Sequence, residues 1–393
     1  MNDLIDLILT HATDPAEESL LREKTAAHVA AVRASAGRGR RGQVAQAEQA
    51  VQVNPSSAFS FDSTGSATLT VAGQTWRAGR FELLSLADLR HRVRARAVAG
   101  ANARARLWVF VGASPVTDIG SLQATNDNNT LFQVASQFNC LESPGPYLTN
   151  VANYFSDPTQ GPRASISAFP ATLLRHYSAP GPNGSILVQQ TDGPQVDLLA
   201  DACGPGISPN GYFTGRGIAS REALIASLES RFDSIRVGVH DDAQVVLGYD
   251  WDGAVEGSEN RRISQVFTST VAGGGYGGEA ALGGEGFEVA CRQLLRAAYL
   301  GTLLAAAHLG RTRVVLTLIG GGVFHNPITL IWNAILWALD EVRPFLSRDL
   351  DVIVNGYNLG TLIDIDRMIL PAVRERSGAI LAFDASGLGK IRR

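Results

Sequence analysis

The chain has 393 residues, of which 45% are hydrophobic and 18% are charged, and its formal net charge is -3. This composition is typical of a globular protein with a substantial core, arranged as one large domain or two ordinary ones. So small a net charge argues against a general attraction to nucleic acid or to a membrane surface.

The cysteines and the first residues bear on compartment and on metal binding. Cys140, Cys203 and Cys291 are far apart and form no C-x-x-C motif, which argues against a zinc site or a disulfide framework. The opening Met1-Asn2-Asp3 is acidic, unlike the basic start of a secretion signal, and no apolar run is long enough to span a bilayer. We therefore expect a cytoplasmic protein with no metal and no cofactor. The sequence leaves its oligomeric state open.

The first hundred residues read as an accessory region of helices and a hairpin. Residues 1–50 have a helical pattern that a basic, glycine-containing segment at residues 38–42 interrupts. Residues 57–80 alternate between apolar and polar side chains on both sides of a Gly-Gln turn, which predicts a hairpin. From Phe81 to Val98 the pattern is helical again. We therefore divide the chain into an accessory region, 1–100, and a main domain, 101–393.

The main domain opens with a strong core strand at Leu107–Val111. A polar loop with Asn126 and Asp127 follows, and it leads into a segment that we interpret as a helix from Leu131 to about Leu141. The apolar face of this helix would hold Leu131, Val134, Ala135, Phe138 and Leu141, with the amides of Gln133, Gln137 and Asn139 lying off it.

Further strands and helices then alternate to the end of the chain. Strands are expected at 235–239, 263–267, 314–319, 350–357 and 379–384, and a long helix at 285–309. Such alternation predicts an α/β fold, specifically a three-layer α/β/α sandwich around a mixed, mainly parallel sheet. Ligands of such folds bind at the carboxyl ends of the strands, where we expect both the 126–127 loop and the residues after Ile319 to lie.

The most informative stretch runs from Arg313 to Pro327. A buried strand, Val314–Ile319, is followed by Gly320-Gly321-Gly322-Val323-Phe324, and Pro327 begins a helix. Glycines allow backbone to approach a ligand, and amides at a helix start bind anions such as phosphate. The alternative is a tight strand-to-helix turn with Phe324 in the core. Glycine content alone does not separate the two.

With the strand at Leu350–Tyr357, this pattern resembles the second ligand loop of macrodomains, the superfamily that includes poly(ADP-ribose) glycohydrolases. The phrases Phe132-Gln133-Val134-Ala135-Ser136 and Phe138-Asn139-Cys140-Leu141-Glu142 are similar to divergent macrodomains that remove ADP-ribose from arginine. The Asp157–Pro162 loop, which contains Gln160, resembles the same group. We expect it to support the site rather than to react. The group's glutamate after the helix tyrosine is replaced here by Leu300, after Tyr299.

The resemblance implies a hydrolase that binds ADP-ribose or an ADP-ribosylated protein. The reaction that the resemblance implies is cleavage of an N-glycosidic bond to arginine. Asp127 is the first candidate for the catalytic carboxylate and Glu142 the second. The implied ligand-binding residues comprise the glycine loop and several amide or aromatic side chains: Asn126, Gln133, Asn139, Gln160, Gly320, Gly321, Gly322, Val323, Phe324, Asn326, Asn355 and Tyr357. Two alternatives stay open: a reader that binds ADP-ribose without cleaving it, and a hydrolase of another NAD-derived metabolite.

Overall fold

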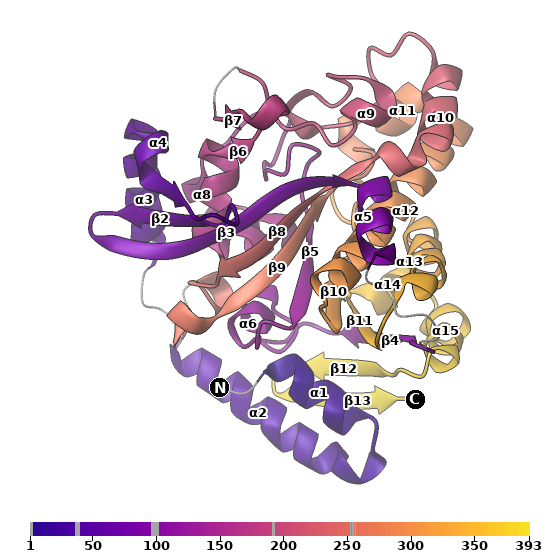
Figure 1. Ribbon diagram of the computed structural model, residues 1–393. Helices are drawn as coiled ribbons and strands as arrows, with labels where there is room; N and C mark the ends of the chain where they lie inside the picture. The colour runs from indigo at the N-terminus through magenta and orange to yellow at the C-terminus, as the bar shows by residue number, and fades with distance from the viewer. Residues whose placement is uncertain are drawn as a thin grey trace.

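The computed structural model describes residues 3–35, 40–95, 102–190, 193–251, 253, 255 and 257–393. It confirms the α/β class: an 11-stranded mixed sheet carries helices on both faces (Figure 1). The strands in spatial order are β1 (Phe59–Phe61), β2 (Ala67–Val71), β3 (Gln74–Ser85), β8 (Arg236–Gln244), β9 (Arg262–Thr268), β5 (Thr130–Ala135), β10 (Arg313–Leu316), β11 (Leu350–Asn355), β4 (Ala105–Val111), β12 (Ile380–Asp384) and β13 (Gly387–Arg392).

The centre of the sheet is parallel and its flanks are antiparallel. β9, β5, β10, β11, β4 and β12 pair in parallel, each with the next. β1, β2, β3, β8 and β9 pair antiparallel at one flank, as β12 and β13 do at the other. Because parallel strands point the same way, the carboxyl ends of β9, β5, β10, β11 and β4 lie along one edge. That edge is where α/β sheets bind ligands.

Helices cover both faces of the sheet. α5 (Leu86–Arg94), α12 (Gly284–Leu309) and α13 (Ile328–Val342) pack on one face, and α7 (Gln160–Ile166) and α8 (Phe169–Tyr177) on the other. A Cβ at Gly301 of α12 would lie 2.7 Å from the Val237 side chain, so this glycine lets the helix approach β8 closely. None of the helices in the described ranges has the length and apolar character needed to cross a membrane.

The strands of the accessory region, β1, β2 and β3, are part of the main sheet. The expected hairpin is present as β2 and β3. β3 continues to Ser85 and pairs with β8, so the helix expected from Phe81 begins only at Leu86, where Ser85 and Asp88 form a capping box. The structure describes this helix, α5, to Arg94. Residues 96–101 and 36–39, which carry the rest of that expected helix and part of the basic interruption, lie outside the described residues.

Two N-terminal helices cover the other end of the sheet. α2 (Glu18–Ser35) packs along β13, and Arg22 of this helix donates a 2.9 Å hydrogen bond to the Leu388 carbonyl. α1 (Leu4–Ala12) lies near the amino ends of the central strands (Figure 1). These helices shield the edge strand, whose unpaired backbone groups would otherwise be open to pairing with another chain.

The predicted helix from Leu131 to Leu141 is wrong. Thr130–Ala135 is the central strand β5, and an irregular turn follows it. Both faces of β5 are covered, so its apolar residues need no alternation. Gln133 does not mark a solvent face. It is fully buried, and its amide donates to Thr302 Oγ1 at 2.8 Å.

Candidate functional site

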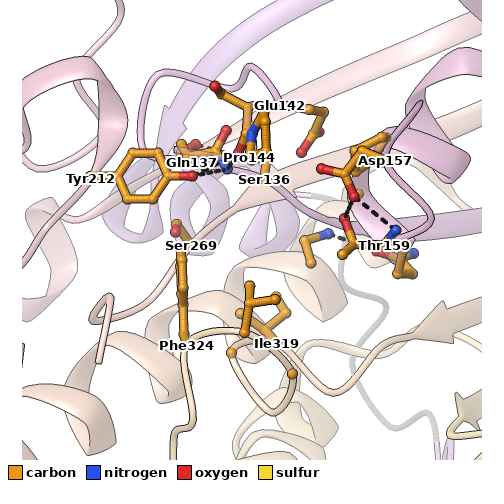
Figure 2. Close-up of a pocket in the computed structure, with 18 of the residues that line it drawn as sticks. Ser136, Gln137, Glu142, Pro144, Asp157, Thr159, Tyr212, Ser269, Ile319 and Phe324 are labelled. Atoms are coloured by element: carbon orange, nitrogen blue, oxygen red, sulfur yellow. Dashed lines mark hydrogen bonds between the residues drawn. The ribbon is translucent and has the colours of Figure 1, made fainter. Parts of the chain in front are cut away.

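A cleft follows the carboxyl edge of the parallel strands. It contains two cavities of about 650 and 630 Å³, in the size range of small-molecule sites. Both cavities are lined by Pro158, Gln160, Thr317, Leu318 and Gly322, so they form one continuous cleft. Figure 2 shows the first cavity, in which Phe324 and Ile319 face Glu142 and Asp157 across the opening.

The glycine loop forms one wall of the first cavity. It leaves the end of β10 and leads to α13, as predicted for the strand-to-helix connection. Gly320 has φ +73°, and a Cβ there would lie 2.1 Å from Asn326 Nδ2, so a side chain would disrupt the turn. Asn326 donates to the Val271 carbonyl at 3.1 Å and accepts from Cys291 Sγ. Asn326 therefore braces this loop and is not a ligand contact.

Most amides of this loop are not used by the fold. Gly321 donates to the Leu318 carbonyl, but among the described residues the N–H groups of Gly320, Gly322, Val323 and Phe324 have no partner. All four of these residues line the first cavity. Neighbouring unpaired amides in a glycine-rich turn are groups that can bind an anion, because each N–H carries a partial positive charge.

An aromatic cluster adjoins the loop. The Phe324 ring makes edge contacts with Tyr276, at 5.3 Å between centroids, and with Tyr212, at 5.8 Å. The Tyr212 hydroxyl donates to the Ser143 carbonyl at 2.6 Å, which ties the cluster to the opposite wall. Phe324 is buried, yet it is part of this local cluster at the cavity and not of the main core.

Glu142 provides a buried acid in the wall that faces the glycine loop. Its backbone N–H donates to Tyr154 Oη at 2.8 Å, and Ser165 Oγ donates to its Oε1 at 2.9 Å. Its Oε2 is buried and makes no hydrogen bond in the part of the chain that the structure describes. Burial raises the pKa of Glu142 to about 8, so the side chain holds a proton at neutral pH.

Glycine at position 161 allows this arrangement. A Cβ there would lie 2.4 Å from Glu142 Oε2 and 2.0 Å from the Ala135 carbonyl oxygen. The backbone of the Asp157–Pro162 loop therefore lies against the Glu142 side chain at Gly161, where no side chain intervenes.

Asp157 is a second carboxylate in the same cavity. Thr159 donates to its Oδ1 from both the backbone and the hydroxyl, at 2.9 and 2.6 Å. The negative charge of Asp157 contributes to the raised pKa of Glu142. We expected the Asp157–Pro162 loop to support the site rather than to react, and the position of Asp157 beside the acid is what the sequence interpretation missed (Figure 2). Its only sequence signal was its place in the loop with Gln160.

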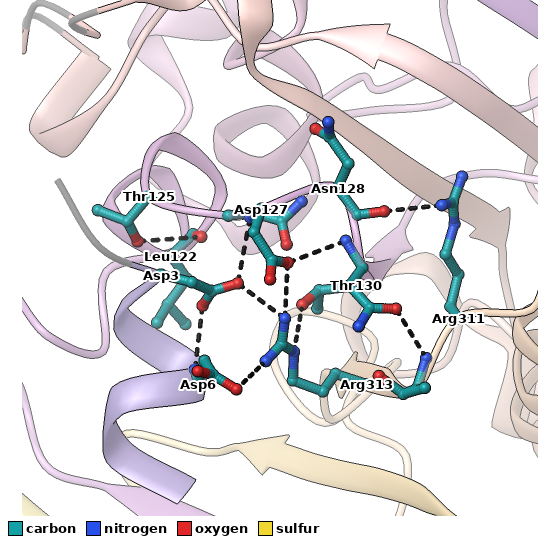
Figure 3. Close-up of polar contacts among 12 residues, drawn as sticks. Asp3, Asp6, Leu122, Thr125, Asp127, Asn128, Thr130, Arg311 and Arg313 are labelled. Atoms are coloured by element: carbon teal, nitrogen blue, oxygen red, sulfur yellow. Dashed lines mark hydrogen bonds and ion pairs between the residues drawn. The ribbon is translucent and has the colours of Figure 1, made fainter. Parts of the chain in front are cut away.

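The expected meeting of Asn126 and Asp127 with the glycine loop is wrong. Because Thr130–Ala135 is a strand parallel to β10, the loop before it lies at the amino edge, opposite the cleft. There Arg313 Nη2 contacts Asp127 Oδ1 at 2.6 Å and Asp3 Oδ2 at 3.0 Å (Figure 3). Asn126 donates to the Arg262 carbonyl at 2.8 Å. Both side chains hold the structure together and line neither cavity of the cleft.

Three other amide side chains proposed as ligand contacts are braces instead. Gln133 lies beneath the cavity, where its Oε1 accepts from the Thr317 N–H at 3.3 Å. Asn139 accepts from the Leu141 N–H and donates to Gln195 Oε1 at 2.9 Å. Gln160 does line the cleft, but its amide bonds to the β5 backbone.

The second cavity contains the last two predicted residues. Asn355, at the end of β11, donates to the Thr117 carbonyl at 2.9 Å, while its Oδ1 is buried without a partner among the described residues. Tyr357 is 63% exposed at the same cavity. The accessible ring of Tyr357 offers a flat surface for a planar ligand group.

No protein-family model matches the sequence, and none of the curated proteins matches it. Among solved structures, the chain is similar to poly(ADP-ribose) glycohydrolase from Thermomonospora curvata, with 15% identity, 86% of this chain and 100% of that chain covered, and a TM-score of 0.44. It is also similar to the glycohydrolase from Deinococcus radiodurans in complex with ADP-ribose, with 13% identity, 75% and 93% covered, and a TM-score of 0.40. At this level of similarity the functional argument rests on the site itself.

Metal binding finds no support in the side-chain arrangement of the described ranges. No group of three or more histidine, cysteine, aspartate or glutamate side chains is placed there to hold an ion.

The structure brings together Glu142, Asp157 and the loop from Gly320 to Phe324 in one cavity, and it separates Asp127 from them.

Proposed function

We propose that this protein is a hydrolase that binds ADP-ribose and releases it from a modified side chain. One observation carries the proposal. The same cavity is lined by four residues of the glycine loop whose N–H groups are unpaired and by Glu142, a protonated acid whose Oε2 has no hydrogen-bond partner among the described residues. The amides suit a diphosphate, and the acid suits cleavage of a glycosidic bond.

The cleft offers a place for each part of the ligand. The diphosphate would lie on the amides of Gly320, Gly322, Val323 and Phe324. The aromatic cluster around Phe324 would contact the distal ribose in the first cavity. The adenine would extend toward Asn355 and Tyr357 in the second cavity, which is continuous with the first.

The two carboxyl groups would divide the chemistry. Cleavage breaks the C1″–N bond, and its electron pair stays on the departing nitrogen, which takes the proton of Glu142. The positive charge that develops on the ribose is stabilised by the nearby carboxylate of Asp157. Water then adds to C1″ and gives its proton to Asp157. This is the division between acid and base found in glycosidases.

The charge of the cavity favours arginine as the modified residue. The acidic groups of its described lining are Glu142, which is neutral, and Asp157, and the lining contains no arginine, lysine or histidine. A cationic guanidinium is therefore attracted to this end of the cleft, while the diphosphate is bound by neutral amides. A cytoplasmic location belongs to the same proposal, which the free cysteines support.

We expect the protein to bind ADP-ribose in calorimetry and to release it from an ADP-ribosylated arginine peptide. Asp127→Asn is the matched control, because Asp127 is a carboxylate at the opposite edge. It should retain the release rate within about twofold, since surface changes away from the site have small effects. Loss of release in Asp127→Asn with an unchanged melting temperature would contradict the placement of the site.

The same assay separates the alternatives. Binding without release from any linkage would identify a reader. Preferential release from poly(ADP-ribose) or from a serine-linked peptide would keep the hydrolase and reject arginine. Failure to bind ADP-ribose, combined with hydrolysis of another NAD-derived metabolite, would reject the proposed ligand.

Gly322→Leu should block the cleft without unfolding the protein. A Cβ at Gly322 meets no atom within 4 Å, and the residue lines both cavities, so a larger side chain would enter the cleft. We expect ADP-ribose affinity to fall by about tenfold or more, a cost of roughly 1.4 kcal/mol. The urea midpoint should be unchanged. Unaltered affinity would show that the ligand does not lie across this loop.

A further inference from the structure

Arg175 of α8 is a fully buried arginine behind the wall that carries Glu142. Its relative exposure is 0%, and its guanidinium lies 3.6 Å from the centroid of the Phe267 ring. Nε donates to the Cys140 carbonyl at 3.2 Å and Nη2 donates to Thr172 Oγ1 at 3.3 Å. Nη1 lies 3.2 Å from His240 Nδ1.

The guanidinium of Arg175 has no ion-pair partner in the part of the chain that the structure describes. Its hydrogen bonds go to neutral groups. Burial lowers the pKa of Arg175 only to about 10, so it stays positive at neutral pH. The pKa of His240 is about 3, because burial and the charge of Arg175 both lower it, so His240 is neutral. A buried charge without a counter-ion costs several kcal/mol. Packing alone could be supplied by a methionine at no such cost.

The contact with Cys140 connects Arg175 to the acid. Cys140 has φ +62°, and its N–H donates to the Gln137 carbonyl, so the chain turns sharply two residues before Glu142. Holding the Cys140 carbonyl therefore fixes the turn that presents Glu142. The positive charge also lowers the pKa of Glu142, against the larger effect of burial.

The other charged and titratable groups around Glu142 cannot replace this charge. Burial keeps Tyr154 and His176, which share a 2.7 Å hydrogen bond, in their neutral forms, because the pKa of Tyr154 is raised and that of His176 is lowered. Burial likewise raises the pKa of the Cys140 thiol. Asp157 is negative and opposes ionisation of Glu142. Arg175 is the cation in this set.

We propose that Arg175 is a positioning residue for Glu142 and that its buried positive charge stabilises the carboxylate formed when Glu142 gives its proton to the leaving group. The proposal rests on the proposed function of Glu142. In the resting site the acid is neutral and the charge of Arg175 is unbalanced. Proton transfer to the departing nitrogen creates the carboxylate, so the two charges balance as the bond to the leaving group breaks.

The test compares Arg175→Met, which keeps the length and loses the charge, with Arg175→Lys, which keeps the charge. Thr172→Val is the control, because it removes one contact of the guanidinium and a hydrogen bond to the Ser165 carbonyl but no charge. The first measurement is the infrared titration of the Glu142 carboxyl, assigned by subtraction of the Glu142→Gln spectrum. It requires no catalysis. The second is the pH dependence of kcat/KM for release from the arginine peptide.

In Arg175→Met the Glu142 titration and the alkaline limb of kcat/KM should both move up by roughly one pH unit or more. The rate at neutral pH should fall, because the carboxylate is less stable. Arg175→Lys and Thr172→Val should titrate close to the wild type. If Arg175→Met does not fold, Arg175→Gln tests the same loss of charge with donors retained.

An unchanged titration in the neutral variants would overturn the proposal, and so would equal shifts in Arg175→Met and Thr172→Val. A shifted titration in a protein that releases no ADP-ribose would support the electrostatic link and reject the proposed reaction, so the two failures are distinguishable.

Discussion

Replacing Glu142 by glutamine should lower kcat for ADP-ribose release by about 10²- to 10⁴-fold, the usual contribution of a general acid. Glutamine keeps the shape of the side chain and still accepts the hydrogen bond from Ser165, but it cannot give a proton to the leaving nitrogen. Affinity for ADP-ribose should stay within about twofold. Release kinetics and calorimetry on the same preparation check both values.

The stability of Glu142→Gln is an internal control for folding. Since the pKa of Glu142 is about 8 in the folded chain and near 4.5 when exposed, the folded state binds more protons between these values. The wild type therefore loses stability as pH rises through that window, and the glutamine variant does not. The variant should be the more stable protein at pH 8, with a difference that shrinks toward pH 4. A variant that is less stable at pH 8 would show that Glu142 is ionised.

Arg313→Met should cost about 3 kcal/mol of unfolding free energy, in the range for breaking a buried ion pair. Arg313 is 5% exposed and contacts Asp3, Asp6 and Asp127 from one guanidinium. Burial already raises the pKa of Asp3 to about 6 despite this arginine, so without it Asp3 takes up a proton. Because protonation removes the buried negative charge of Asp3, it limits the loss of unfolding free energy. The measurement is urea unfolding at pH 7.

Arg348→Met is the matched control, because Arg348 is an exposed arginine that lines the same surface pocket as Arg313. It should change stability by less than about 0.5 kcal/mol. ADP-ribose binding by Arg313→Met should remain intact under conditions where it is folded. Equal stability of the two variants would mean that the N-terminal helix is not held by this cluster.

The strand-to-helix element around the glycine loop was predictable from sequence because its signals are local. A branched apolar run favours a strand, three glycines favour a turn and a proline favours a helix start, and these local signals agree. The same holds for the hairpin around Gly73 and for the long helix ending at Leu309. The observed β10 is shorter than predicted, ending at Leu316, because Thr317–Ile319 already turn toward the cleft.

The segment from Leu131 to Leu141 could not be assigned in this way. Its apolar residues fit both a helix face and a strand buried on both sides, and the amide of Gln133 looked like a solvent-facing group. The hydrogen-bond partners of Gln133 are Thr302 and the Thr317 backbone, 169 and 184 residues away in the chain. Because the segment was assigned to a helix, the loop before it was expected at the carboxyl edge of the sheet, and so Asp127 was placed in the site ahead of Glu142.

The contacts of Gln160 have a consequence for how the protein takes up its ligand. Ser136 N–H bonds to β9, so Ala135 N–H and the Gln133 carbonyl point the other way, where β10 has already diverged. Gln160 bonds to both, at 2.9 and 3.0 Å, and acts as a substitute for a neighbouring strand. Contacts within the fold itself thus keep the carboxyl ends of β5 and β10 apart where both line the cleft. Association should proceed without an opening step, at a rate set by diffusion and orientation.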